Sequence, residues 1–174
     1  MGEQVHAYGD DVLADHDGIA LAALIRSREV SRREVVEAAL QRARKVDGVL
    51  HAVQVLDEVR AIGAVVRPGP FSGVPTFVKD NTDLAGYPTN HGSEAFTAEP
   101  ATRDGAFAKV LLHQGLVPLG KSRLPEFGFN ASTEFMTQDP VRNPWDTDYS
   151  AGASSGGAAA LVAAGVVPLA HGRL

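Results

Sequence analysis

Cysteine is absent from this 174-residue sequence, which excludes a disulfide framework and any chemistry that depends on a thiolate. Long apolar runs are also absent, so no stretch is long enough to span a bilayer. Residues 1–17 are acidic and polar, and they lack the basic and apolar regions of a signal peptide. From these absences we expect a soluble protein located in the cytoplasm.

Positive charge is scarce relative to negative charge. The sequence has 16 Lys and Arg residues against 21 Asp and Glu residues, a net charge of −5 at pH 7. Nucleic acids and anionic membranes bind basic patches, so neither is expected as the main partner. A neutral small molecule is easier to accommodate. The length corresponds to about one domain, and we expect residues 1–174 to form one domain or part of one.

Two helices are predicted within about residues 17–47. Asp17 is a suitable N-cap for a short apolar helical pattern. Ser31 and Glu34 form the capping-box pattern of a second helix, and Asp47-Gly48 is expected to end it.

From about residue 51 onward, short strand and helix patterns alternate, which predicts an α/β core. Strands are expected within residues 51–56, 73–81 and 116–119, and helices at residues 57–66 and 104–114. Residues 120–137 are expected to be irregular. One face of the helix predicted at residues 104–114 is expected to contain Ala106, Phe107, Val110 and Leu111.

Lys79 ends the predicted strand within residues 73–81. A lysine at a strand end beside buried apolar residues can have its pKa lowered by desolvation, which makes it a candidate base. The alternative is a solvated lysine that forms a salt bridge with Asp80. Because buried lysines are rare, this stretch considered alone favours the alternative.

A pair of serines, Ser154 and Ser155, lies between glycines and opens onto the apolar run at residues 158–165. This pattern predicts a loop-to-helix junction, where the first backbone N–H groups have no partner within the helix. The small neighbours leave both hydroxyls accessible, as an active serine requires. Serine is also among the best N-cap residues, so the stretch alone leaves a purely structural role equally open.

Two other motif matches do not fit their context. Residues 115–122 match the phosphate-binding P-loop pattern, but they follow a predicted helix and contain a strand-like segment, whereas a P-loop follows a strand and opens a helix. Residues 152–156 match the G-x-S-x-G elbow of α/β-hydrolases, which needs a later acid and histidine. No Asp or Glu follows Ser155, so neither nucleotide binding nor this hydrolase triad is expected.

With the lysine and the serine pair, the chain resembles the amidase signature family over nearly all of its length. The matching motifs, in order, are Gly73-Val74-Pro75, Lys79-Asp80, Leu119-Gly120-Lys121, Glu126-Phe127, Asn143-Pro144-Trp145 and Gly152-Ala153-Ser154-Ser155-Gly156-Gly157. The resemblance implies the N-terminal part of an α/β/α sandwich with a mixed sheet. It also implies amide-bond hydrolysis by a Ser-cisSer-Lys triad.

Carried over by motif, Lys79 matches the catalytic lysine and Ser154 matches the serine that follows a cis peptide bond. Ser155 matches the second serine of the pair, which supports the loop. The two catalytic groups are expected to lie within roughly 2.6–3.2 Å of each other, or one water apart. No cofactor and no metal are implied, and the histidines need no catalytic role, so His171 is expected to pack or cap locally.

The resemblance is incomplete at the C-terminal end. Family members continue beyond the segment that matches residues 166–172 into a Gly-Gly-Ser stretch, which carries the nucleophilic serine. We therefore expect an N-terminal fragment that lacks the nucleophile and its oxyanion hole and is inactive alone. We also expect that the cis peptide could relax to trans, and that residues 159–167 are left without a covering partner.

The expected function is hydrolysis of a small-molecule amide to a carboxylate and ammonia or an amine, with a linear amide as the leading substrate. Residues 143–172 also resemble cyclic-dimer amide hydrolases of the 6-aminohexanoate type. An amidotransferase A subunit acting on glutamyl-tRNA is a more distant alternative. A non-catalytic remnant that binds a partner or ligand stays open, as does a homodimer.

Overall fold

The computed structural model describes residues 2–172, and its centre is a three-stranded sheet. The strands are β1 (Val53–Leu56), β2 (Pro75–Lys79) and β3 (Val117–Ser122), in the order β1-β3-β2. β3 pairs in parallel with β2 and antiparallel with β1. The sheet is therefore mixed, as the sequence predicts, and β2 is one of its edge strands.

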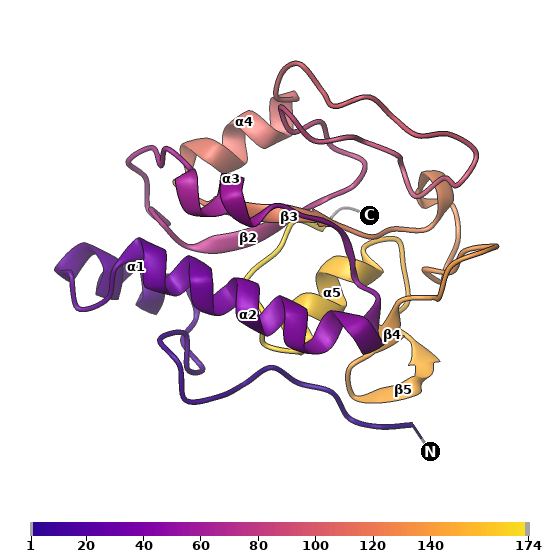
Figure 1. The fold of residues 1–174 in the computed structure, drawn as a ribbon, viewed down its shortest axis with the longest axis horizontal. Coiled ribbons are helices and arrows are strands. Elements are labelled where there is room, and N and C mark those ends of the chain that lie inside the picture. The colour runs from indigo at the N-terminus through magenta and orange to yellow at the C-terminus, as the bar shows by residue number, and fades with distance from the viewer. Residues whose placement is uncertain (1, 173–174) are drawn as a thin grey trace.

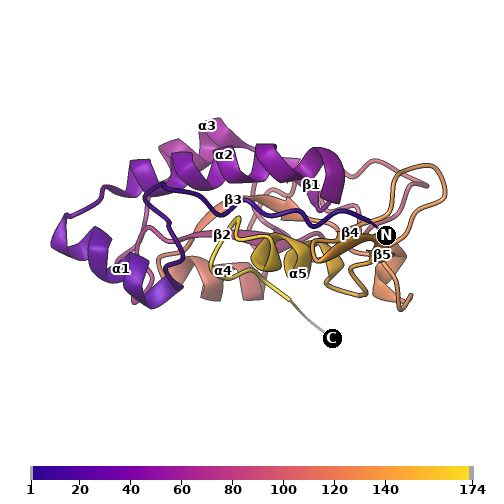
Figure 2. The same ribbon diagram turned by 90° about the horizontal axis from the view of Figure 1, so that it is seen from below.

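Helices cover both faces of this sheet (Figures 1 and 2). α2 (Arg32–Leu50) and α3 (Glu58–Gly63) lie on one face, and α4 (Ala106–His113) and α5 (Gly156–Ala163) lie on the other. α1 (Gly18–Ser27) lies beside one end of the layers. This three-layer order confirms the predicted α/β/α arrangement.

The N-terminal caps form as predicted, but the second helix ends later than expected. The Asp17 carboxylate accepts hydrogen bonds from the N–H groups of Ile19 and Ala20, and Ser31 and Glu34 form a complete capping box. α2 continues through Gly48 to Leu50, which is completely buried. Burying this leucine outweighs the cost of about 1 kcal/mol for a glycine in a helix.

The later part of the chain differs from the prediction in two boundaries and two additional elements. β3 extends to Ser122, into the stretch predicted to be irregular, because it bonds to a strand on each side. α3 ends at Gly63 rather than near residue 66. A short hairpin of β4 (Arg142–Asn143) and β5 (Asp146–Ser150) was not predicted, and a 3-10 turn occupies Glu126–Gly128.

The predicted inner face of α4 is also wrong. Ala108 and Leu111 are the buried residues of this helix, whereas Phe107 and Val110 are 48% and 57% exposed. The helix has only two turns, so it buries a narrow stripe rather than a wide face.

The apolar segment at residues 159–167 is covered, contrary to expectation. Within this range only Ala159 is classed as exposed. The N-terminal segment contributes to the cover: the Ala7 N–H donates to the Ala164 carbonyl at 2.7 Å, and the Tyr8 ring lies against Gly165. The N-terminal segment runs along the lower side of Figure 1 before α1 begins.

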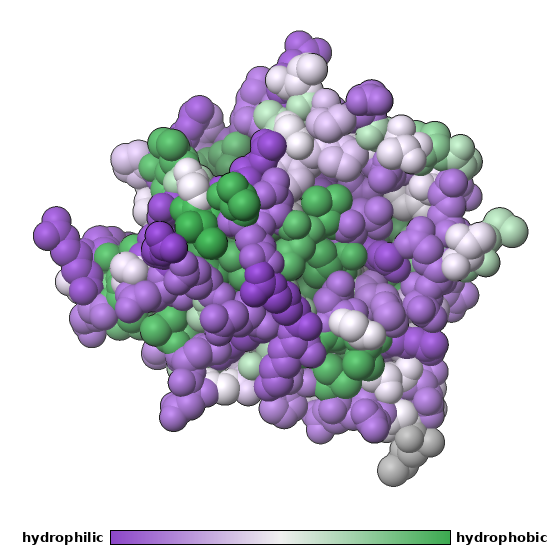
Figure 3. Space-filling model, in the orientation of Figure 1, coloured by the Kyte–Doolittle hydropathy of each residue, from purple (hydrophilic) through white to green (hydrophobic). Residues whose placement is uncertain are grey.

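The surface in Figure 3 shows hydrophobic areas separated by hydrophilic side chains. No helix in residues 2–172 is both long enough and apolar enough to cross a membrane.

Candidate active site

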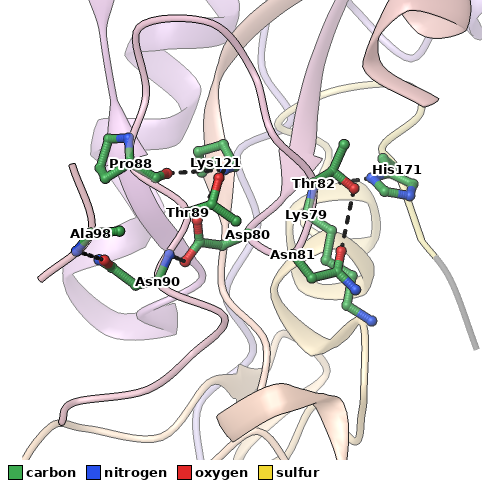
Figure 4. Close-up of polar contacts among 10 residues, drawn as sticks. All are labelled: Lys79, Asp80, Asn81, Thr82, Pro88, Thr89, Asn90, Ala98, Lys121 and His171. Atoms are coloured by element: carbon green, nitrogen blue, oxygen red, sulfur yellow. Dashed lines mark hydrogen bonds and ion pairs between the residues drawn. The ribbon is translucent and has the colours of Figure 1, made fainter. Parts of the chain in front are cut away.

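Lys79 is the last residue of β2, and the side chains around it bury it almost completely, leaving 1% of its surface exposed. The alternative of a solvated lysine paired with Asp80 is therefore wrong. The Asp80 carboxylate instead faces Lys121, with Oδ1 and Nζ 3.0 Å apart. Figure 4 shows Asp80 directed toward Lys121, while the Lys79 side chain extends to the other side of the chain, as side chains alternate along an extended backbone.

The Asp80–Lys121 pair forms hydrogen bonds with residues 88–90 in the loop that follows β2. Lys121 Nζ donates to the Pro88 carbonyl at 3.1 Å and to Thr89 Oγ1 at 3.2 Å. Asp80 Oδ2 accepts from the Asn90 N–H at 3.2 Å. Burial raises the pKa of the Asp80 carboxyl and lowers the pKa of Lys121, since each charge loses hydration. The lysine of the P-loop pattern is thus a buried structural residue on a strand.

The serine loop is shaped by Gly152, whose φ of 75° lies in the left-handed region. The Gly152 carbonyl accepts from the Thr133 N–H at 3.1 Å and from Thr133 Oγ1 at 2.7 Å, and its N–H donates to Ser150 Oγ at 3.1 Å. The peptide bond between Ala153 and Ser154 is cis.

Gly157 lets the start of α5 approach the sheet closely. A Cβ atom at this position would lie 2.5 Å from the Ala52 carbonyl oxygen and 2.6 Å from the Arg123 nitrogen. The Gly157 N–H donates to the Arg123 carbonyl at 3.1 Å. This contact fixes the beginning of α5, and with it the serine pair, relative to the strand ends.

The hydroxyl groups of Ser154 and Ser155 both lie within hydrogen-bonding distance of the Lys79 amine. Lys79 Nζ lies 2.8 Å from Ser154 Oγ and 3.0 Å from Ser155 Oγ. The first distance falls in the range expected for the two predicted catalytic groups. Ser155 occupies the N-cap position of α5 but makes no side-chain capping hydrogen bond, so the simple N-cap interpretation does not describe it. Its contact with Lys79 was not predicted, because the resemblance assigned Ser155 only to loop support.

The arrangement can transfer protons along a short path. An amine and a hydroxyl within hydrogen-bonding distance can exchange a proton directly. Ser154 and Ser155 are partly exposed, whereas Lys79 is buried. A hydroxyl can therefore link the buried amine to a reacting group that arrives from outside.

A metal site or a cavity could also mark a functional site, apart from the cluster of Lys79, Ser154 and Ser155. Among residues 2–172, no group of three or more His, Asp or Glu side chains is placed to hold a metal. A cavity of about 500 Å³ is lined by neither Lys79 nor the serine pair; its residues are Gly92, Glu94, Ala95, Glu126, Asn130, Glu134, Phe135, Met136 and Thr137.

Comparison with known proteins gives a consistent result. The family model described as Amidase matches residues 34–173. The protein named "Putative amidase AmiC" from Mycobacterium leprae is 52% identical over 171 residues, which are 97% of this chain and 36% of that protein. The A subunit of glutamyl-tRNA(Gln) amidotransferase from Acidothermus cellulolyticus is 40% identical over 164 residues, 88% of this chain and 32% of that protein.

A solved structure of 6-aminohexanoate cyclic dimer hydrolase superposes with a TM-score of 0.84 at 34% identity, covering 94% of this chain and 34% of that one. This chain spans about a third of the length of the curated relatives it matches. Because the family model covers most of the residues, and the fold matches a solved member, the chain belongs to the amidase signature family.

Proposed function

We propose that this chain supplies the lysine base and the bridging serine of an amide hydrolase. The observation that carries the proposal is the 2.8 Å contact between Lys79 Nζ and Ser154 Oγ in a member of this family. In this proposal Lys79 acts as a neutral amine, and Ser154 links it to the nucleophile.

The proposed reaction moves one proton along this path in each direction. As a nucleophilic hydroxyl attacks the amide carbon, its proton passes to Ser154 Oγ, and the Ser154 proton passes to Lys79 Nζ. When the carbon–nitrogen bond breaks, Lys79 returns a proton through Ser154 to the leaving nitrogen. Water then hydrolyses the acyl-enzyme ester and releases the carboxylate.

The nucleophile in this scheme comes from the family resemblance. In family members it is a serine in a Gly-Gly-Ser stretch that follows the position of Gly172. We therefore propose that hydrolysis needs that stretch, and that a polypeptide limited to residues 1–174 does not turn over amides.

A linear small-molecule amide is the substrate we favour, because the relative that is 52% identical is named an amidase. A cyclic amide is the second candidate, supported by the TM-score of 0.84 with the cyclic dimer hydrolase. A cytoplasmic location, a single structural domain and a partner other than nucleic acid or membrane belong to the proposal too. The location rests on the absence of cysteine, the single domain on the length of 174 residues, and the exclusion of nucleic acid and membrane partners on the net charge of −5.

A chimera tests the function. Residues 1–172 replace the matched part of the M. leprae protein, and release of ammonia or amine is measured with linear aliphatic, aromatic and cyclic amides. The unmodified M. leprae protein is the positive control. We expect the chimera to hydrolyse linear amides; a chimera that folds but acts on no amide, while the parent does, would argue for a non-catalytic role.

A further inference from the structure

His171 lies on the outer edge of β2, next to the proposed base. The segment that contains it runs beside this edge strand: Thr76 Oγ1 donates to the Leu169 carbonyl at 3.1 Å, and the His171 N–H donates to the Phe77 carbonyl at 3.0 Å. The His171 side chain is buried, and Figure 4 shows it next to the main chain of Lys79.

The imidazole ring binds the main chain of Lys79. The Asp80 N–H donates inward to the Ser122 carbonyl of β3, and the preceding Lys79 N–H donates to His171 Nδ1 at 3.3 Å. A ring nitrogen accepts a hydrogen bond only when it carries no proton. This contact therefore selects the neutral tautomer with its proton on Nε2.

Phe107 on α4 holds the ring in place. The two ring centroids are 4.1 Å apart, and the planes are inclined by 25°, which is a stacked arrangement. This contact gives a role to an aromatic side chain that α4 leaves half exposed.

We propose that His171 is a positioning residue for Lys79: its neutral imidazole anchors the lysine main chain at the edge of β2, and Phe107 orients the ring. The inference rests on the proposed function for its importance to catalysis. It goes beyond that function because the Ser-cisSer-Lys triad assigns no part to a histidine. A buried backbone N–H that loses its acceptor is destabilising, so loss of Nδ1 should loosen the strand end that places the amine.

The first test is a spectroscopic measurement on the unaltered chain of residues 1–174. Nitrogen-15 NMR of the histidine side chains distinguishes the two neutral tautomers and the charged ring. The His171 signal is assigned by its loss in His171→Asn. We expect an unprotonated Nδ1 and a protonated Nε2 near neutral pH; a proton on Nδ1 would overturn the proposal.

The second test separates the acceptor from the ring. His171→Phe keeps a flat ring against Phe107 but removes the acceptor, whereas Asn in His171→Asn places a carbonyl oxygen near the position of Nδ1. We expect hydrogen exchange of the Lys79 amide to rise about tenfold or more in the Phe variant and to stay near the original rate in the Asn variant. Equal exchange in His171→Phe and the original chain would refute the anchor.

The same pair of variants in the chimera measures the effect on catalysis. We expect kcat to fall about 10–100-fold in His171→Phe, with KM little changed, and to recover in His171→Asn. An unchanged kcat in His171→Phe would refute the positioning role. The NMR results do not depend on turnover, so failure of the anchor and failure of the proposed hydrolase function are distinguishable.

Discussion

The amine nitrogen of Lys79 lies 2.8 Å from the hydroxyl oxygen of Ser154, although the two residues are 75 positions apart in the sequence. The lysine arrives at the end of a buried edge strand, and the serine arrives on the loop before α5. Two separate elements thus place an amine and a hydroxyl within the distance that direct proton transfer requires.

A polypeptide limited to residues 1–174 should release no measurable ammonia from short aliphatic or aromatic amides. The proposed mechanism uses Lys79 and Ser154 to serve a nucleophile that family members carry in a later segment. Lys79→Ala and Ser154→Ala serve as controls. Turnover in the original polypeptide that disappears in both variants would contradict this expectation and assign the nucleophile to another serine of this chain.

Breaking the buried Asp80–Lys121 pair should destabilise the fold strongly. Removing one partner leaves an uncompensated charge, so Asp80→Asn or Lys121→Met should each lower the free energy of unfolding by about 3–5 kcal/mol. The double variant should lose much less than the sum of the two. Urea unfolding measures all three, with the exposed Arg33–Glu37 pair as the control in which a single change has little effect. Additive losses in the double variant would show that the two groups are not coupled.

Tyr87 should make the fold sensitive to alkali. Burial, together with the negative charge of Asp57, raises the pKa of Tyr87 from 10.0 to about 12. Between these values the folded state holds the proton that the unfolded state has released, so the free energy of unfolding falls as pH rises. The loss attributable to this group is about 2–3 kcal/mol.

The Tyr87→Phe variant tests the predicted loss of stability at high pH, because it removes the titrating hydroxyl and keeps the ring under the Arg60 guanidinium. The variant should lose less stability than the original chain between about pH 10 and pH 12. Near neutral pH we expect a change close to zero, since the buried Tyr87 hydroxyl has no hydrogen-bond partner among residues 2–172. If the two proteins lose stability in parallel as pH rises, Tyr87 does not cause the loss.

Two glycines should respond in opposite ways to alanine. Gly157→Ala places a methyl group 2.5 Å from a backbone carbonyl oxygen and should cost about 1–3 kcal/mol of stability. Gly48 lies in the last turn of α2, on the exposed side of the helix, with no atom within 4 Å of an added Cβ. Gly48→Ala should therefore gain up to about 1 kcal/mol. Thermal unfolding of both variants checks the contrast, which fails if Gly157→Ala is tolerated as well as Gly48→Ala.

Local patterns in the sequence predict the elements whose signals are local. The Asp17 cap and the capping box at Ser31 depend on residues within one helical turn, and both form as predicted. The end of α2 and the length of β3 depend on distant partners. A glycine-containing segment such as residues 120–122 becomes a strand only because two other strands bond to it.

The same distinction holds at the candidate site. Motif order identifies Lys79 and Ser154, and the family resemblance predicts their contact. The contact of the Ser155 hydroxyl with the amine and that of the imidazole with the Lys79 amide were not predicted, and both join segments more than 70 positions apart. The pairing of Asp80 with Lys121 is likewise set by strand register, since Val78 lies opposite Lys121 across the parallel ladder. Sequence spacing carries no signal for these contacts.

The most direct test of the central claim is a double-mutant cycle for Lys79 and Ser154 in the chimera, measured as kcat/KM for a linear amide. If the two groups form one proton path, Lys79→Ala and Ser154→Ala should each reduce kcat/KM by about 100-fold or more, and the double variant should lose little beyond the larger single effect. Matched unfolding curves confirm that the variants remain folded. Near-original activity in either folded variant, or losses that multiply in the double variant, would contradict a shared path through Lys79 and Ser154.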